Sequence, residues 1–162
     1  MANEKRNKII KRSLLGLLAI LLVIQFIHPA KNVSAEVKPQ DINVLYPVPD
    51  SVKLVLGKAC MDCHSNNTRY PWYSKVQPVA WWLNDHINEG KRELNFSEFG
   101  VRTPEKQAKK LRKLVKEVQE GGMPLDSYTW IHKDAVLTER EKNMLIDWAN
   151  GLADKIQPKT TM

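Results

Sequence analysis

The run Cys60-Met61-Asp62-Cys63-His64 constrains the fold more than any other feature, because it holds the only two cysteines among 162 residues. Cysteines at i and i+3 and a histidine at i+4 share one face of a helical turn. Two thiols one turn apart can add to the two vinyl groups at one edge of a porphyrin, and the adjoining imidazole then reaches the iron. This spacing is the attachment signature of a c-type haem. We therefore predict one haem c per chain, held by Cys60 and Cys63, with His64 as an axial iron ligand.

Three other interpretations of the two cysteines explain less of the sequence. A thioredoxin-like redox pair is expected within a βαβ pattern, which the chain does not show. A zinc site requires a further cysteine or histidine at motif spacing, and His86 and His132 are isolated. A disulfide between Cys60 and Cys63 suits an exported protein, but it gives no role to His64.

Met123 is the predicted sixth ligand of the iron. It follows Gly121 and Gly122, which end a predicted helix, and Pro124 fixes the backbone after it. A thioether on such a loop suits a weak, soft iron ligand, and Met123 lies 60 residues after Cys63 in the chain. The other methionines are terminal, inside the attachment motif, or on an apolar helix stripe: Met1, Met162, Met61 and Met144.

His86 is the alternative sixth ligand. It lies on the apolar face of a predicted helix, where a core role or a contact with a haem propionate is favoured. The sequence leaves both assignments of the sixth ligand open.

The first 35 residues have the pattern of an export signal. Six basic residues and one acidic residue give them a balance of +5, and an apolar run of 15 residues follows, from Ser13 to Ile27. Val33-Ser34-Ala35 permits cleavage after Ala35, whereas the helix-ending Pro29 after the run favours an uncleaved membrane anchor. The predicted divisions are a signal or anchor segment, an extended linker and a haem-binding domain: 1–35, 36–49 and 50–157.

This N-terminal segment also predicts where the domain resides. Basic residues before an apolar helix stay on the cytoplasmic side. The domain is therefore expected on the periplasmic side of the bacterial inner membrane, anchored by an N-terminal helix, or soluble in the periplasm if the chain is cleaved after Ala35.

The positive charge is concentrated in the same segment. The net charge is +7, and residues 36–162 carry only +2 of it. A nucleic-acid partner is therefore not expected. The basic run from Lys106 to Lys116 is typical of a solvated helix face, with a docking patch for an acidic redox protein as the alternative.

The rest of the chain is predicted to be all-α, because apolar residues recur at helical spacing and no alternating strand pattern is present. Four helices are expected to begin near Asp50, Pro78, Thr103 and Thr138. Gly90 is expected to end the second helix and Gly121 the third, and Thr138 opens a capping box. The connections are long for a plain bundle, which indicates that they wrap a bound group: 61–77, 91–102 and 121–137.

These features together resemble the small monohaem class I cytochromes c and, more closely, the bacterial haem-binding domain family related to them. The matching stretches, within about residues 43–153, are Cys60 to Asn66, Tyr70 to Tyr73, the helix with Trp82 and His86, Leu94 to Ser97, and Met123 to His132. The resemblance implies a cytochrome c-like bundle of about four helices with long loops around a covalent haem, and His64 and Met123 as axial ligands. The short helix before the motif departs from ordinary cytochrome c.

An iron with both axial positions filled has no open site for substrate, so the sequence predicts an electron carrier and not an enzyme. Its partners are expected to be redox proteins. The alternative is a haem-based peroxidase, or a gas or redox sensor, in which Met123 leaves the iron. The sequence offers no catalytic triad, phosphate-binding glycine loop or paired carboxylates for other chemistry.

Overall fold

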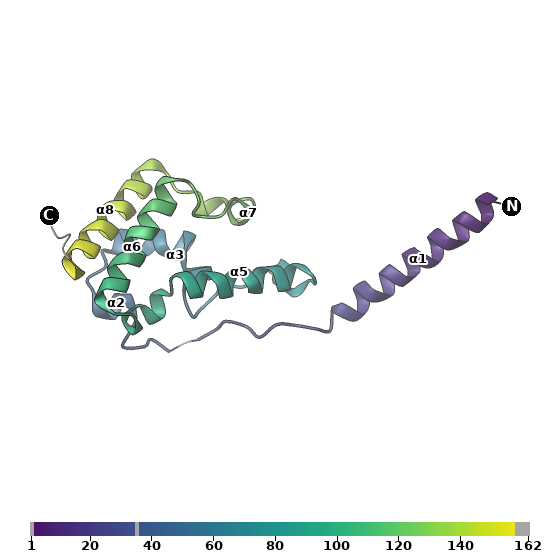
Figure 1. Ribbon diagram of the computed structural model, residues 1–162, viewed down its shortest axis with the longest axis horizontal. Coiled ribbons are helices and arrows are strands. Elements are labelled where there is room, and N and C mark those ends of the chain that lie inside the picture. The colour runs from purple at the N-terminus through teal and green to yellow at the C-terminus, as the bar shows by residue number, and fades with distance from the viewer. Residues whose placement is uncertain (1, 35, 158–162) are drawn as a thin grey trace. The chain divides into compact units, whose positions relative to one another are not determined.

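The computed structural model describes residues 2–34 and 36–157, and this part of the chain contains helices and no strand (Figure 1). The longer helices are α1 (Ala2–Ile24), α3 (Asp50–Ala59), α5 (Val79–Glu93), α6 (Pro104–Gln119) and α8 (Glu139–Ile156). The shorter ones are α2 (Ile42–Leu45), α4 (Met61–His64), η1 (Trp72–Lys75), η2 (Phe96–Val101), α7 (Asp126–Thr129) and η3 (Lys133–Ala135). The all-α prediction is confirmed, including the four helices of the body. The predicted long connections contain most of the short helices.

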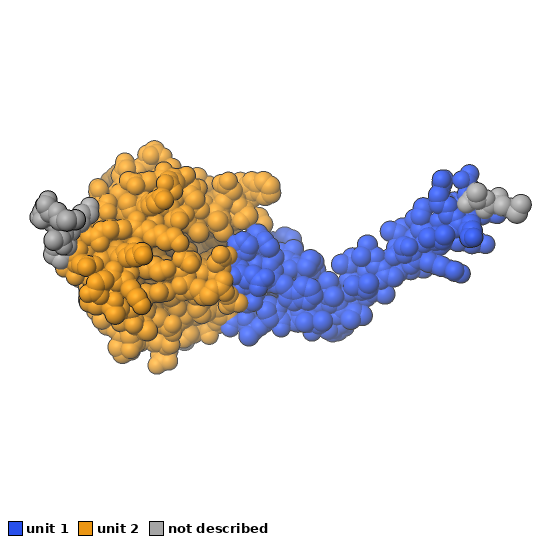
Figure 2. Space-filling model, in the orientation of Figure 1, with its two compact units in different colours: residues 1–31, 70–86 blue, residues 32–69, 87–162 orange. Residues whose placement is uncertain are grey.

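The chain forms two compact units, which Figure 2 colours separately. Unit 1 comprises residues 1–31 and 70–86, and unit 2 comprises residues 32–69 and 87–162. Helix α5 contributes its first half to unit 1 and its second half to unit 2. The attachment motif therefore lies in unit 2.

The apolar stripes that predicted α3, α6 and α8 form the core of unit 2. Helix α6 packs along α8, and α3 contacts α8. Leu111 of α6, Leu145 of α8 and Leu56 of α3 are buried in this cluster, together with Phe96 and Phe99 from η2. Burial of each such side chain contributes about 1.5–3 kcal/mol relative to exposure. The core therefore holds the helices beside the motif in a fixed arrangement.

The ends of α6 and α8 follow the predicted local chemistry. Pro104 occupies the first turn of α6, and Gly121 adopts a φ of 75° after its last turn, a conformation that costs glycine little. The amides of Gly122 and Met123 both donate to the carbonyl oxygen of Glu117, at 2.8 and 3.1 Å. The backbone that leads to Met123 is thereby fixed to the end of α6.

The capping box at the start of α8 also carries an ion pair. Thr138 accepts from the amide of Glu141, whose carboxylate accepts from the amide of Thr138 at 2.9 Å. Lys58 of α3 lies 2.7 Å from the same carboxylate. These interactions lower the pKa of Glu141 to about 2. The hydrogen bond from Lys58 has the largest effect, and the bond from the Thr138 amide has the next largest.

We expect Glu141→Gln to make the free energy of unfolding less dependent on pH below about 4.5. A depressed carboxyl pKa stabilises the fold above the unfolded pKa of about 4.5 and loses this contribution as the pH falls towards 2. The variant should lose about 1 kcal/mol at pH 7, after allowance for solvent screening of a side chain that is 24% exposed. Urea unfolding at a series of pH values measures both effects. An equally steep decline in wild type and variant between pH 4.5 and 2 would contradict the assignment.

Residues 36–49, predicted to be an extended linker, contain a helical turn that packs into unit 2. Asp41 caps α2 by accepting from the amide of Asn43 at 2.8 Å, and Ile42 is fully buried in the core. A four-residue helix is too short to show a 3.6-residue period, so its single buried side chain gave no pattern to detect.

The prediction of a membrane-spanning helix is not supported by the structure. No helix within residues 2–34 and 36–157 is both long and apolar enough to cross a bilayer. Helix α1 ends at Ile24, so its apolar part after Arg12 extends only about 18 Å at about 1.5 Å per residue. The predicted cleavage site includes Ala35, which lies outside the described residues.

Candidate functional site

The attachment motif folds as one helical turn. The amides of Cys63 and His64 donate to the carbonyl oxygen of Cys60, at 3.2 and 2.9 Å, and α4 runs from Met61 to His64. The two thiols are free and partly exposed. The turn therefore presents Cys60, Cys63 and His64 within one winding of the backbone, which is the arrangement that the spacing predicts.

The surroundings of the two cysteines raise the pKa of both thiols. Burial, and to a smaller extent Cys63, raises the pKa of Cys60 to about 12, while burial and Asp62 raise the pKa of Cys63 to about 11. A raised pKa disfavours the thiolate, which is the form that exchanges with a disulfide. No group of three or more metal-ligating side chains occurs in the described part of the chain, and no disulfide joins the two cysteines. A zinc site at the two cysteines therefore lacks further ligands in the described part of the chain.

His64 is oriented by a backbone carbonyl. Its Nδ1 lies 2.8 Å from the carbonyl oxygen of Leu94, which can only accept, so Nδ1 carries the proton and Nε2 keeps its lone pair. The ring also packs edge-on against buried Phe96, with 6.5 Å between ring centroids. Burial lowers the pKa of His64, against smaller opposing effects of the Leu94 and Gly90 carbonyls and Glu93. A neutral imidazole with a fixed donor nitrogen is what an iron ligand requires.

Gly90 lets α5 pass close to the motif, and it does not end that helix as predicted. Helix α5 continues to Glu93. A Cβ atom at position 90 would lie 2.7 Å from the carbonyl oxygen of Cys63 and 3.1 Å from its Cβ. Glycine is therefore required here by close approach of two backbones, and the extra turn brings Leu94 to His64. The sequence shows this glycine but not the neighbour that it accommodates.

Asp62, inside the motif, is a buried carboxylate with several donors. Its Oδ1 accepts from the backbone N–H and the Nε of Arg69, each at 3.1 Å, and its Oδ2 accepts from the hydroxyl of Tyr128 at 2.7 Å. Burial, followed by the hydrogen bond to Asp62, raises the pKa of Tyr128. Tyr128 belongs to α7, five residues beyond Met123. The hydrogen bond between Tyr128 and Asp62 thus links the attachment motif to the segment that follows Met123.

Two of the stretches that carry the family resemblance meet in space beside the motif. The amide of Asn66 donates to the hydroxyl of Ser97 at 3.2 Å, and the Nδ2 of Asn95 donates to the Oδ1 of Asn66 at 2.9 Å. Together with the bond from His64 to Leu94, these contacts join residues 64–66 to residues 94–97. The loop after the second cysteine is thus fixed on the same side as the histidine.

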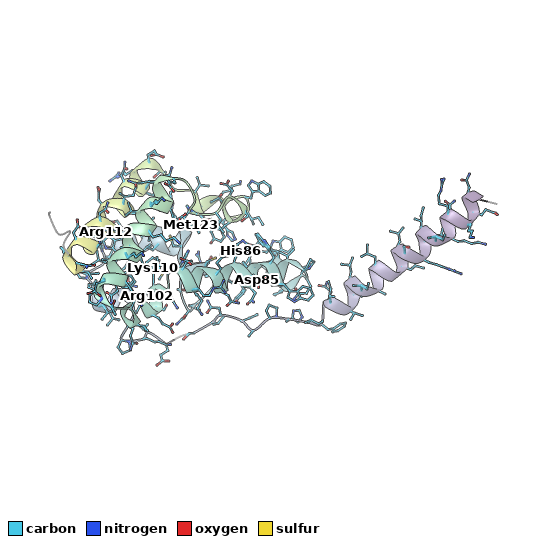
Figure 3. The ribbon with its side chains drawn as sticks, in the orientation of Figure 1. Asp85, His86, Arg102, Lys110, Arg112 and Met123 are labelled. Atoms are coloured by element: carbon cyan, nitrogen blue, oxygen red, sulfur yellow. The ribbon has the colours of Figure 1, made fainter. Side chains whose placement is uncertain are left out.

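Met123 lies on the turn after α6, partly buried (Figure 3). The role of Met123 as sixth ligand stays a prediction. Met144 packs against the core of unit 2, as its place on the apolar stripe predicts. Met1 and Met162 lie outside the described residues.

His86, the alternative sixth ligand, belongs to unit 1. Its Nδ1 donates to the carbonyl oxygen of Trp82 one turn earlier, at 2.9 Å, and the two rings lie 4.3 Å apart. Trp82 is 46% exposed, so the predicted apolar face of this helix is only partly buried. Leu83 and Ile87 form its buried side.

The basic run on α6 is largely paired within the protein. Lys110 and Lys113 both contact Glu93, at 3.1 and 2.8 Å, and Arg112 lies 2.8 Å from Asp154 of α8; Figure 3 labels Lys110 and Arg112. These pairs tie α6 to its neighbouring helices. They favour the helix-face interpretation over a free docking patch.

The donor set fits a covalently bound haem. The motif supplies two free thiols and a histidine whose Nδ1 is bonded to the Leu94 carbonyl oxygen, and Gly90 provides the close approach that brings α5 against the turn. Sequence reasoning found Cys60, Cys63 and His64, but gave no role to the Leu94 carbonyl or to Asp62. A carbonyl has no residue-type signal, and Asp62 occupies a position that the motif leaves unspecified.

Comparison with known proteins agrees with this fit. No curated protein and no solved structure shows a significant match to the chain. A family model described as the haem-binding domain matches residues 19–151, well over half of the 162 residues. The chain therefore belongs to the haem-binding domain family.

Proposed function

We propose that this protein carries one haem c, bound covalently through Cys60 and Cys63 and ligated by His64, and that it transfers electrons. The observation that carries the proposal is the single turn that holds two free thiols beside an imidazole whose Nδ1 is bonded to the Leu94 carbonyl oxygen. That bond leaves Nε2 as the metal-binding atom.

The attachment chemistry follows from the two thiols. Each Sγ–H adds across one vinyl C=C bond, so that one C–S bond and one C–H bond form with no net oxidation. When bound, haem supplies an iron that changes between the ferrous and ferric states by one electron. The chain holds His64 in one tautomer and one ring orientation, and the core around Phe96 excludes water from one side of the imidazole.

Met123 is the proposed sixth ligand. The fixed end of α6 positions its backbone through Glu117, and the bond from Tyr128 to Asp62 ties the following segment to the motif. An iron with histidine and methionine ligands is low spin, has a raised potential and suits electron transfer. Redox proteins are the proposed partners.

We expect Met123→Ala to change the iron site and leave the haem attached. The oxidised wild-type protein should show the weak red charge-transfer band of iron–thioether bonding. The variant should lose this band, have a lower potential and bind carbon monoxide or cyanide. Absorption spectra and redox titration measure these changes.

Met144→Ala and His86→Ala are the matched controls. Because Met144 packs at the edge of the core, its truncation should cost about 1–3 kcal/mol and leave the spectrum unchanged. Conversion to high spin in His86→Ala, with Met123→Ala unaltered, would assign His86 as the ligand. A wild-type iron that is already high spin and reacts with peroxide would instead favour the peroxidase or sensor function.

The proposed location is the periplasmic side of the bacterial inner membrane. A basic cluster followed by an apolar run is typical of an export signal. Covalent haem attachment of this type takes place outside the cytoplasm, so export and the attachment motif are consistent with one another. Fractionation of cells with an antibody to the domain tests this location.

A further inference from the structure

The segment that follows α1 is fixed in unit 1 by side chains of specific chemistry. The side chain of Gln25 bonds to both backbone groups of Gln77. Its Nε2 donates to the Gln77 carbonyl oxygen at 3.1 Å, and its Oε1 accepts from the Gln77 backbone N–H at 3.0 Å. The carbonyl oxygen of Ile27 accepts from the Nε2 of Gln77 at 2.8 Å and from the indole of Trp81 at 2.9 Å. A side-chain amide that satisfies both backbone groups of one residue acts as a two-point clamp.

A second set of contacts, within unit 2, centres on Asn32. Its carbonyl oxygen accepts from the amide of Thr68 at 2.9 Å, and its Nδ2 donates to the carbonyl oxygen of Ser65 at 2.8 Å and to the Thr68 hydroxyl at 2.9 Å. The ammonium of Lys91 donates to the Oδ1 of Asn32 at 2.6 Å. The backbone and the side chain of Asn32 thus join the loop after the motif to α5.

These contacts reach the haem-attachment turn directly. Ser65 follows His64 in the chain, and the hydroxyl of Thr68 donates to the carbonyl oxygen of Asp62 at 2.6 Å. Ser65 and Thr68 are buried, at 3% and 6% exposure, so their polar groups depend on protein partners. Asn32 therefore supports the motif from both sides of His64.

We propose that residues 25–34 form a strap that stays in the mature protein, and that Asn32 is a positioning residue for the attachment motif. The predicted cleavage after Ala35 would remove every contact that Gln25, Ile27 and Asn32 make. The match to the family model begins at residue 19, which places the strap inside the matched region. The positioning role rests on the proposed haem function, whereas retention of the strap stands on the contacts alone.

The intact mass of the exported, purified protein under denaturing conditions tests retention. The mass gives the N-terminus and the number of attached haem groups separately. A chain that begins before Gln25 is expected, and any chain that begins after Gln25 would overturn the strap. A chain that keeps the strap but lacks haem would overturn the proposed function and leave the strap standing.

Asn32→Ala tests the positioning role, with Asn88→Ala, an exposed change on the same helix as Lys91, as the control. In the variant, hydrogen exchange at the Thr68 amide should become about tenfold faster or more. The potential and the electron paramagnetic resonance signal of the oxidised iron should also shift, because the histidine ring is held less firmly. The exchange rate, the potential and the resonance signal should all be unchanged in Asn88→Ala. A lowered melting temperature with an unchanged potential and signal would overturn the positioning role.

Discussion

Replacing Gly90 by alanine should destabilise the domain and reduce the fraction of chains that carry covalent haem. The added Cβ would lie 2.7 Å from the backbone carbonyl oxygen of Cys63, and a backbone atom cannot turn aside as a flexible side chain can. Overpacking of this kind costs about 1–3 kcal/mol, which outweighs the gain in helix propensity of up to about 1 kcal/mol. Urea unfolding measures the loss of stability, and the haem absorbance per chain measures attachment.

Gly57→Ala and Gly151→Ala are the matched controls, since both glycines lie in helices and a Cβ at either position meets no atom within 4 Å. Each should stabilise the protein by up to about 1 kcal/mol. The prediction is therefore one of opposite sign between position 90 and the two controls. Stabilisation by Gly90→Ala would show that α5 does not approach the motif as described.

Asp62→Ala should also destabilise the domain, because the variant loses the hydrogen bonds that this carboxylate accepts. The carboxylate accepts from Arg69 and from Tyr128, and it is 7% exposed. Its removal leaves the Arg69 amide and the Tyr128 hydroxyl without this acceptor, at a cost of about 2–4 kcal/mol. The loop that carries Met123 should also be held less firmly, so the variant is expected to bind carbon monoxide more readily.

Two further variants serve as comparisons for the stability loss in Asp62→Ala. Tyr128→Phe removes one of the bonds to Asp62 and should cost about 1–2 kcal/mol. Asp50→Ala removes an ion pair with Lys53 on a side chain that is 94% exposed, and it should change stability by no more than about 0.5 kcal/mol. An Asp62→Ala variant as stable as Asp50→Ala would contradict a structural role for the buried carboxylate.

The four helices of the body were predictable because their information is local. Apolar spacing fixes the buried stripe, and residues such as Thr138, Glu141 and Gly121 carry the end signals in their own chemistry. The attachment turn was predictable for the same reason, since its three functional side chains lie within five consecutive residues.

The support of the site was not predictable because it depends on residues distant in the chain. Gly90 has the same signal whether it ends a helix or admits a neighbouring backbone, and only the packed structure distinguishes the two. The bond between Asp62 and Tyr128 spans 66 residues. The partner of His64 is a backbone carbonyl of Leu94, which any residue type could supply.

The N-terminal region shows a further limit of pattern reasoning. A basic cluster and an apolar run indicate targeting, and neither pattern assigns a role to Gln25 or Asn32. Single polar residues such as Gln25, inside the apolar run, and Asn32, after it, have no periodic signature. Their roles became visible only through their bonds to Gln77 and Thr68.

The most direct test of the central claim is whether haem stays on the unfolded chain. The protein is produced in a host that attaches c-type haem outside the cytoplasm, denatured, and extracted with acidified organic solvent. The haem should remain with the protein, its alkaline pyridine spectrum should be that of thioether-substituted haem, and a Cys60→Ser, Cys63→Ser double variant should release or lack it. Haem that extracts fully from the unaltered protein would contradict covalent attachment through Cys60 and Cys63.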